Sequence, residues 1–279
     1  MCSILYEGFF LFVYICPMPS NTKEQKLQAF SRLLDVMDEL REKCPWDMKQ
    51  TNESLRHLTI EETYELADAI LQNNPTEIKK ELGDVLLHIV FYARIGSETN
   101  SFDIADVINS LCEKLISRHP HIYGDVKVEN AEQVKENWEQ LKLKEGNKSV
   151  LSGVSKGTPS IIKALRMQEK AAQVGFDWNT ADQVWAKVEE ELIEFKEELS
   201  QSNNLQKSQE EFGDLLFAMI NLARKSNLNP DDALEFTNQK FLKRFMFIEE
   251  RANAMNKKLT DMSLEEMDAI WNEAKGIKN

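Results

Sequence analysis

The chain has 279 residues, of which 29% are charged, and its 47 acidic side chains outnumber the 34 basic ones to give a formal net charge of −13 at pH 7. This balance excludes a protein that binds nucleic acid through its phosphates, and any phosphate-bearing ligand would need metal ions or a few placed cations. The length suffices for two domains that each bury a core.

The first 22 residues form a tail that differs from the rest of the sequence. Its apolar run, Phe9–Cys16, is shorter than the roughly 20 residues that cross a bilayer, and neither a basic segment nor a cleavage site marks a secretory signal. We therefore expect no membrane partner. We interpret residues 1–22 either as the product of a mis-assigned start, with Met18 as the true first residue, or as a hydrophobic tail of unknown purpose. The four cysteines include no CxxC pair, which favours a reduced, cytoplasmic compartment.

Helical periodicity and helix caps run through the rest of the chain without a competing strand pattern, so we predict an all-α fold. Pro75 follows two asparagines and suits the first turn of a helix, where its missing N–H needs no partner. The predicted helices of the N-terminal half lie at Lys23–Lys43, at Ser54–Leu71, from Pro75 onward, at Ile104–Arg118 and at Glu132–Lys144.

A polar stretch at 146–159 contains three glycines and a proline, and we interpret it as a linker. It separates an N-terminal unit, 23–145, from a C-terminal unit, 160–279. In the second unit a turn is expected at Gly175–Trp178. Helix starts are predicted there at Ser160, at Pro230 and at two capping boxes, Thr180 with Gln183 and Ser263 with Glu266.

An acidic pattern in the second unit predicts a metal site. It reads EExxE, ending in Glu191 and Glu194, and is followed after a polar break by ExxD at Glu211 and Asp214. Residues three apart share a helix face, so two antiparallel helices would bring these four carboxylates together. Crowded carboxylates need a cation, and hard oxygen ligands suit Mg²⁺ or Mn²⁺. The alternative is an ordinary solvated surface, since lone acidic patterns on helices are common.

The same pattern occurs earlier in the chain, which favours the metal site over chance. Glu62 precedes Glu191 by 129 residues and Asp84 precedes Asp214 by 130, so one residue is inserted in the polar break. Such a repeat signals two copies of one helical unit. The copies differ at one cation: Leu58 stands where the second copy has Lys187. The possible second metal set of the N-terminal unit is Glu62, Glu65, Glu81 and Asp84.

Other catalytic chemistries lack their motifs. The sequence has no glycine-rich phosphate loop, no G-x-S-x-G and no Cys/His pair beside an acid, so a covalent nucleophile is not expected. A di-iron bundle needs Glu-x-x-His pairs, and the second unit has no histidine.

The acidic pattern and several further strings resemble the MazG-type all-α nucleoside triphosphate pyrophosphohydrolases, in particular their tandem-domain bacterial members. The resemblance covers Lys23 to Lys275 and rests on CPWDMKQT, LTIEETYELADAI, ELGDVLLHIVFYARI, RHPHIYGD, VGFDW, EFGDLLFAMINLAR and KFLKRF. It implies hydrolysis of nucleoside triphosphates to monophosphate and pyrophosphate with Mg²⁺. It also implies an intertwined homodimer with packing of the four-helix-bundle type, and it favours the broad specificity of nucleotide-pool house-cleaning.

The resemblance assigns roles by position and places hydrolysis in the C-terminal unit. Lys187 is expected to stabilise charge on the phosphates, and Glu190 is the candidate for orienting or deprotonating the attacking water. Two alternatives stay open: a nucleotide-sensing or partner-docking dimer with vestigial hydrolysis, and a pyrophosphohydrolase for one nucleotide. The implied metal ligands are Glu191, Glu194, Glu211 and Asp214, and the implied nucleotide contacts are Lys187, Glu190, Lys207, Glu210, Lys240, Arg244 and Trp271.

Overall fold

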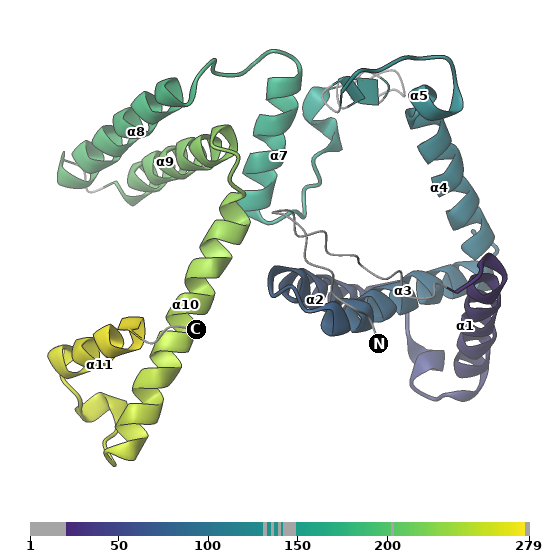
Figure 1. Ribbon diagram of the computed structural model, residues 1–279, viewed down its shortest axis with the longest axis horizontal. Helices are drawn as coiled ribbons and strands as arrows, with labels where there is room; N and C mark the ends of the chain where they lie inside the picture. The colour runs from purple at the N-terminus through teal and green to yellow at the C-terminus, as the bar shows by residue number, and fades with distance from the viewer. Residues whose placement is uncertain are drawn as a thin grey trace, which may run out of the picture. The chain divides into compact units, whose positions relative to one another are not determined.

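The computed structural model describes residues 21–130, 133–134, 137–138, 141, 149–201 and 204–276. The described residues form helices, turns and loops and contain no β-strand, which confirms the all-α prediction. The chain divides into two compact units, Met1–Leu115 and Ile116–Asn279 (Figure 1). Met18 and nearly all of the predicted N-terminal tail lie outside the described residues, as does most of the helix predicted at Glu132–Lys144.

The first unit is built on an antiparallel helix pair. Helix α2 begins two residues before the predicted start because Thr51 caps it, in a capping box with Ser54. Asn74 caps α3, with Pro75 in its first turn as predicted. The elements in order are α1 (Lys23–Lys43), the 3-10 helix η1 (Asp47–Lys49), α2 (Asn52–Leu71), α3 (Pro75–Glu98) and α4 (Ile104–Arg118), of which α4 runs across the division between the units.

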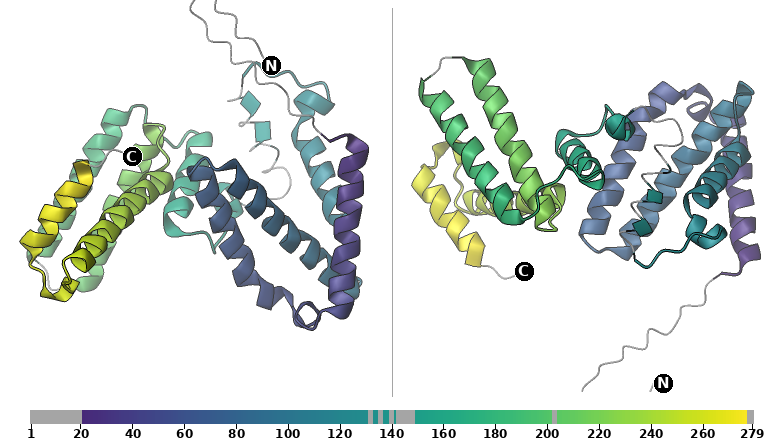
Figure 2. Two further views of the ribbon diagram at one scale, coloured as in Figure 1. Left: turned by 60° about the horizontal axis from the view of Figure 1, so that its bottom comes forward. Right: turned by 90° about the horizontal axis from the view of Figure 1, so that it is seen from above.

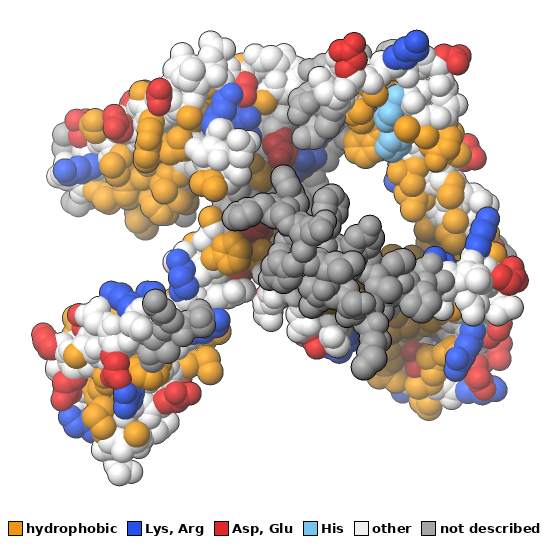
Figure 3. Space-filling view, in the orientation of Figure 1, with side chains coloured by type: hydrophobic (Ala, Val, Ile, Leu, Met, Phe, Trp, Pro, Cys, Tyr) orange, Lys and Arg blue, Asp and Glu red, His pale blue; other side chains and the backbone are white. Residues whose placement is uncertain are grey.

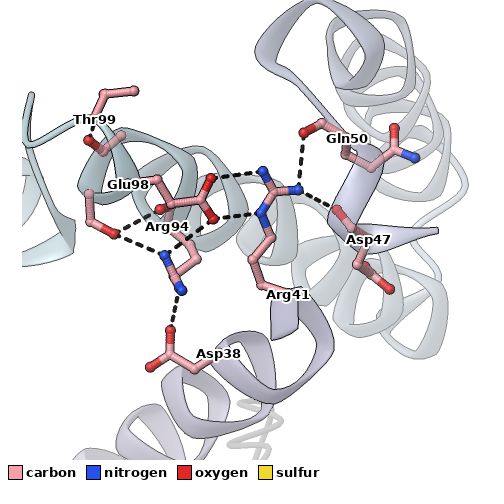
Figure 4. A network of polar contacts seen from close by, with 9 residues as sticks. Asp38, Arg41, Asp47, Gln50, Arg94, Glu98 and Thr99 are labelled. Atoms are coloured by element: carbon pink, nitrogen blue, oxygen red, sulfur yellow. Dashed lines mark hydrogen bonds and ion pairs between the residues drawn. The ribbon is translucent and has the colours of Figure 1, made fainter. Parts of the chain in front are cut away.

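The core of this unit lies where α1 and α2 pack on α3. Met37, Leu55, Val90 and Phe91 are its most buried members, each at most 2% exposed. Beside them Arg41 of α1 donates hydrogen bonds to both carboxylate oxygens of Glu98 and to two backbone carbonyls of the loop after α1, those of Asp47 and Gln50 (Figure 4). One guanidinium thus fixes that loop to the end of α3.

The second unit repeats the antiparallel pair and adds a long helix. Helix α8 packs against α9, α7 packs on α9, and α11 folds back on α10 (Figures 1 and 2). The elements in order are α5 (Pro120–Tyr123), the 3-10 helix η2 (Val150–Gly153), α7 (Ser160–Gln173), α8 (Ala181–Gln201), α9 (Leu205–Lys225), α10 (Pro230–Ala254), the 3-10 helix η3 (Leu259–Asp261) and α11 (Leu264–Gly276).

Local chemistry fixes the ends of these helices. Both predicted capping boxes are present, with reciprocal hydrogen bonds between Thr180 and Gln183 and between Ser263 and Glu266. Gly175, with φ of 85°, follows α7 and turns the chain through a conformation that side chains rarely adopt. Within the described residues, no helix is both long and apolar enough to cross a membrane.

The α8–α9 pair leaves an apolar face uncovered. Figure 3 shows hydrophobic side chains gathered along this pair, and many of them are about half exposed. Among them are Leu192, Ile193, Phe212, Leu216 and Met219. An exposed row of this kind is typical of a surface that another protein element covers.

Candidate active site

Three acids of the predicted metal set meet between α8 and α9. Glu191, Glu211 and Asp214 each offer a carboxylate oxygen, and these oxygens lie within 4.8 Å of one another. Glu191 is buried, whereas Asp214 is exposed, so the group opens to solvent on one side. The fourth predicted ligand, Glu194, is exposed, and among the described residues it is not part of the group within that distance.

Lys187 stands one helical turn before Glu190 and Glu191 on α8 and pairs with both carboxylates at once. Its Nζ lies 2.8 Å from Glu190 Oε1 and 2.7 Å from Glu191 Oε1. The hydrogen bonds that Lys187 donates to Glu190 and Glu191 raise the pKa of Lys187 far above its ordinary value. Lys187 is therefore a permanent cation that orients the buried Glu191 carboxylate beside the open acid group.

Two acids of the group line a cavity of about 630 Å³ inside the second unit. They are Glu191 and Asp214, and Lys187 lines it beside them. The rest of the wall is mainly apolar or aromatic, with Ala218 from α9 contributing a small side chain. Further lining residues are Leu151, Met167, Gln168, Phe176, Trp178, Phe217 and Asn221. The cavity was not predicted from the sequence, because its shape depends on how α7, α8 and α9 cross. The feature of the sequence that could have indicated it is the small Ala218 inside a run of large apolar residues.

The turn between α7 and α8 is fixed to α9 by an ion pair at the cavity wall. The Asp177 carboxylate accepts hydrogen bonds from the Arg224 guanidinium and lies 2.8 Å from Lys225 Nζ. Burial favours the neutral acid, but the hydrogen bonds from Arg224 and Lys225 outweigh it, so the pKa of Asp177 lies below its ordinary value. This contact holds Phe176 and Trp178 at the cavity.

The remaining predicted substrate contacts lie elsewhere in the second unit. Lys207 Nζ pairs with the buried Glu198 at 2.7 Å, and Glu210 accepts a hydrogen bond from Gln206. Arg244 stacks over the Trp271 ring at 5.4 Å, and Lys240 is exposed on α10. Among the described residues, the acid group and the cavity lining do not include any of these five predicted contacts: Lys207, Glu210, Lys240, Arg244 and Trp271.

The first unit has a matching acid group without a counterpart of Lys187; its cation is Lys80 of α3, whose Nζ lies 2.8 Å from Glu81 Oε1. Glu62, Glu81 and Asp84 offer oxygens within 4.8 Å of one another, and Glu65, exposed on the next turn, is outside that group of described residues. Glu81 is 3% exposed, and its Oε2 has no hydrogen-bond partner in the described part of the chain. Burial and then the charges of the neighbouring acids, Asp84 first, raise the pKa of Glu62.

The positions that open the cavity in the second unit carry large buried side chains in the first. When the copies are aligned on Asp84 and Asp214, His88 corresponds to Ala218 and Phe91 to Asn221. His88 is buried, with Nδ1 2.9 Å from Thr59 Oγ1, and Phe91 belongs to the core. Leu58, which corresponds to Lys187, packs against the same core. Side chains in the first unit therefore occupy the space that corresponds to the cavity of the second unit.

Comparisons with known proteins show what the chain is similar to. A family model, the MazG nucleotide pyrophosphohydrolase domain, matches residues 50–123. The chain is 43% identical over 252 residues to the nucleoside triphosphate pyrophosphohydrolase/pyrophosphatase MazG of Thermotoga maritima, covering 88% of this chain and 96% of that protein. It is 38% identical over 257 residues to the nucleoside triphosphate pyrophosphohydrolase of Escherichia coli, covering 89% and 98%. An uncharacterized Bacillus subtilis protein, YabN, is 46% identical over 270 residues, which cover 94% of this chain and 54% of that protein.

Proposed function

We propose, for a chain that belongs to the MazG family of nucleoside triphosphate pyrophosphohydrolases, that its second unit hydrolyses nucleoside triphosphates to nucleoside monophosphate and pyrophosphate. One observation carries the proposal: Glu191, Glu211 and Asp214 converge beside Lys187, and Lys187, Glu191 and Asp214 line a cavity of about 630 Å³. Anionic metal ligands and a fixed cation in a wall that is otherwise mainly apolar suit a ligand with a polyphosphate part and a flat part.

The donor set fits Mg²⁺, with Mn²⁺ as a substitute. Three carboxylates with oxygens within 4.8 Å of one another are hard ligands with an excess of negative charge, which a divalent cation would balance. Glu191, Glu211 and Asp214 would hold it, and Glu194 is the proposed fourth ligand. When bound, Mg²⁺ would screen the phosphate charges and lower the pKa of a bound water.

The protein's own residues then bind and orient the reactants. Lys187 is cationic and carries three N–H donors, so it can turn from Glu190 toward the phosphate oxygens of an entering triphosphate. Glu190, whose side chain is 55% exposed, is then available to accept a proton from the water that attacks the α-phosphorus. Pyrophosphate would leave in line with that attack.

The proposed active form is a homodimer. The uncovered apolar row on α8 and α9 supports packing of this pair against the same pair of a second copy, as in a four-helix bundle. The predicted contacts on α10 and α11, Lys240, Arg244 and Trp271, do not line the cavity of their own chain in its described part. In a dimer, α10 and α11 of one copy would contribute these contacts to the cavity of the partner. Light scattering would measure whether the mass is that of a dimer.

The reaction is tested by its products and by metal removal. With ATP or dATP the expected products are the monophosphate and pyrophosphate, without orthophosphate until a pyrophosphatase is added. Chelation with EDTA should abolish turnover and excess Mg²⁺ should restore it, because the unscreened acids would repel the triphosphate. Direct release of orthophosphate and a diphosphate would contradict attack at the α-phosphorus, and full activity in EDTA would contradict the role of the acids. Broad specificity predicts that nucleoside triphosphates with several different bases are hydrolysed.

A further inference from the structure

The cavity wall contains a buried amide whose orientation is fixed. Gln168 of α7 is 6% exposed, and its Nε2 donates a hydrogen bond of 2.8 Å to the backbone carbonyl of Phe217 on α9. Because a carbonyl can only accept, the nitrogen must face Phe217 and the side-chain oxygen must face the other way. That oxygen, Oε1, is buried and has no hydrogen-bond partner in the described part of the chain.

A second amide in the same wall is fixed in the opposite sense. The side-chain oxygen of Asn221 accepts hydrogen bonds from Arg224, at 3.1 Å from Nε and 2.8 Å from Nη2. Its Nδ2 therefore faces away from Arg224. Gln168 and Asn221 both line the cavity, and in each of them the hydrogen bond fixes which end of the side-chain amide is the donor and which is the acceptor.

The residues around these two amides indicate which chemical group of a ligand would bind to them. Lys187, Glu191 and Asp214 line one part of the cavity wall, and with a bound cation this part suits phosphates. Phe176 and Trp178 line the cavity and are 83% and 43% exposed, so their rings are available to stack on a flat group. A nucleobase is flat, and adenine, cytosine, guanine and uracil each carry an N–H donor beside an acceptor on the Watson–Crick edge.

We infer that Gln168 and Asn221 position the nucleobase of the substrate, with Gln168 Oε1 accepting a hydrogen bond from a base N–H. The inference rests on the proposed function. It adds that the second unit recognises the nucleobase of the substrate as well as its phosphates. Gln168 is a positioning residue, because it touches the base and not the reacting phosphorus. A buried acceptor without a partner disfavours any ligand that has no N–H to offer, which selects nucleotides over bare polyphosphates.

The test compares substrates that differ only at the base. ATP carries the 6-amino group, purine riboside triphosphate lacks it without added bulk, and ribose 5-triphosphate has no base. With the wild-type full chain, kcat/KM for ATP should exceed that for purine riboside triphosphate by roughly 10–100-fold, mostly through KM, which is the scale of a buried acceptor left unpaired. Gln168→Leu should lose this preference while it keeps its activity toward ribose 5-triphosphate within about twofold.

A matched control is Asp38→Leu, since Asp38 lies nine residues before Asp47, as Gln168 lies nine residues before the corresponding Asp177. Asp38 pairs with Arg94 in the first unit. Asp38→Leu should leave the ratio between ATP and purine riboside triphosphate unchanged. An equal loss on all three substrates in Gln168→Leu would show a structural role only. A difference in kcat/KM between ATP and dATP, without one between ATP and purine riboside triphosphate, would show that Gln168 Oε1 binds the ribose hydroxyl and not the base. Either result overturns the inference.

The wild-type measurements stand even if Gln168→Leu does not fold. Equal kcat/KM for ATP and purine riboside triphosphate in the wild type would by itself overturn the inference, while pyrophosphate release from both would leave the proposed function intact. If the wild type releases no pyrophosphate from any of these substrates, the proposed function fails, and the inference fails with it.

Discussion

The two units share an acid group but differ in the side chains that fill or leave open the space beside it. In the first, Leu58, His88 and Phe91 close the space beside the acids with packed side chains. In the second, the corresponding positions hold Lys187, Ala218 and Asn221 and line a cavity. A repeated metal-binding pattern thus identifies related units, and residues one or two helical turns away decide which unit has room and charge for a substrate.

The turn before the acid-bearing helix pair also differs between the units. In the first, Arg41 holds the backbone carbonyls of Asp47 and Gln50 (Figure 4). In the second, Arg224 and Lys225 hold the carboxylate of Asp177, which corresponds to Asp47. The same loop position is therefore fixed through the main chain in one unit and through a titratable side chain in the other.

The largest expected effect separates the units by activity. Glu191→Ala or Lys187→Ala should lower turnover at least about a hundredfold, the scale of losing one preorganised electrostatic contact. Glu62→Ala, the matched change in the first unit, should cost little, because no cation stands at position 58. The three variants are assayed with several nucleoside triphosphates at saturating Mg²⁺, after circular dichroism and light scattering confirm an unchanged fold and mass.

This comparison breaks if Glu62→Ala proves as damaging as Glu191→Ala in a well-folded protein. The first unit would then be a second active site or a required structural partner. The assignment of hydrolysis to the second unit alone would be wrong.

A smaller effect concerns stability in the first unit. Arg41→Ala removes the hydrogen bonds to Glu98 and to the two loop carbonyls, and we expect a loss of about 2 kcal/mol in the free energy of unfolding, less than for a fully buried pair because Glu98 is partly exposed. Urea denaturation followed by circular dichroism measures it. Lys43→Ala on the same helix, which removes only the exposed pair with Glu39, should leave the free energy of unfolding nearly unchanged. Equal effects of the two substitutions would contradict the anchoring role of Arg41.

The smallest effect sharpens the contrast between the two turns and depends on pH. The lowered pKa of Asp177 means that its ion pair stabilises the fold fully above about pH 4, the ordinary value for Asp, and that this stability is lost as the pH falls through the lowered pKa. Asp177→Asn should therefore cost about 1 kcal/mol at neutral pH and progressively less in acid. Denaturation midpoints of both proteins at several pH values measure the gap, and a gap that stays constant from neutral pH to about pH 2 would refute this role.

Local chemistry made the helices predictable. Pro75 and Pro230 open helices because their fixed backbone suits a first turn, and the two capping boxes specify their own starts. The meeting of Glu191 with Glu211 and Asp214 also followed from helix periodicity once the helices were taken as antiparallel. These features depend on residues that are near one another in the sequence.

The cavity could not be predicted from residues that are near one another in the sequence, because it depends on how the helices cross. Gln168 looked like an ordinary polar residue on a helix, and only its packing on Phe217 buries it. Lys207 follows the polar break, and its partner, Glu198, is set by the way in which α8 and α9 meet. Position-by-position comparison of the two copies, His88 against Ala218 above all, was the signal in the sequence that could have indicated the cavity.

The short helix η2 has a practical consequence for dissecting the chain. It lies within the stretch predicted as a linker, yet it packs on α7, and its Leu151 lines the cavity of the second unit. A fragment cut at Ser160 would retain every proposed ligand and catalytic side chain but would expose the apolar wall at Met167 and Ala171 to water. Truncation studies of the second unit should therefore begin upstream of Ser149, and weak nucleotide binding by a shorter fragment would reflect a missing wall and not an inactive site.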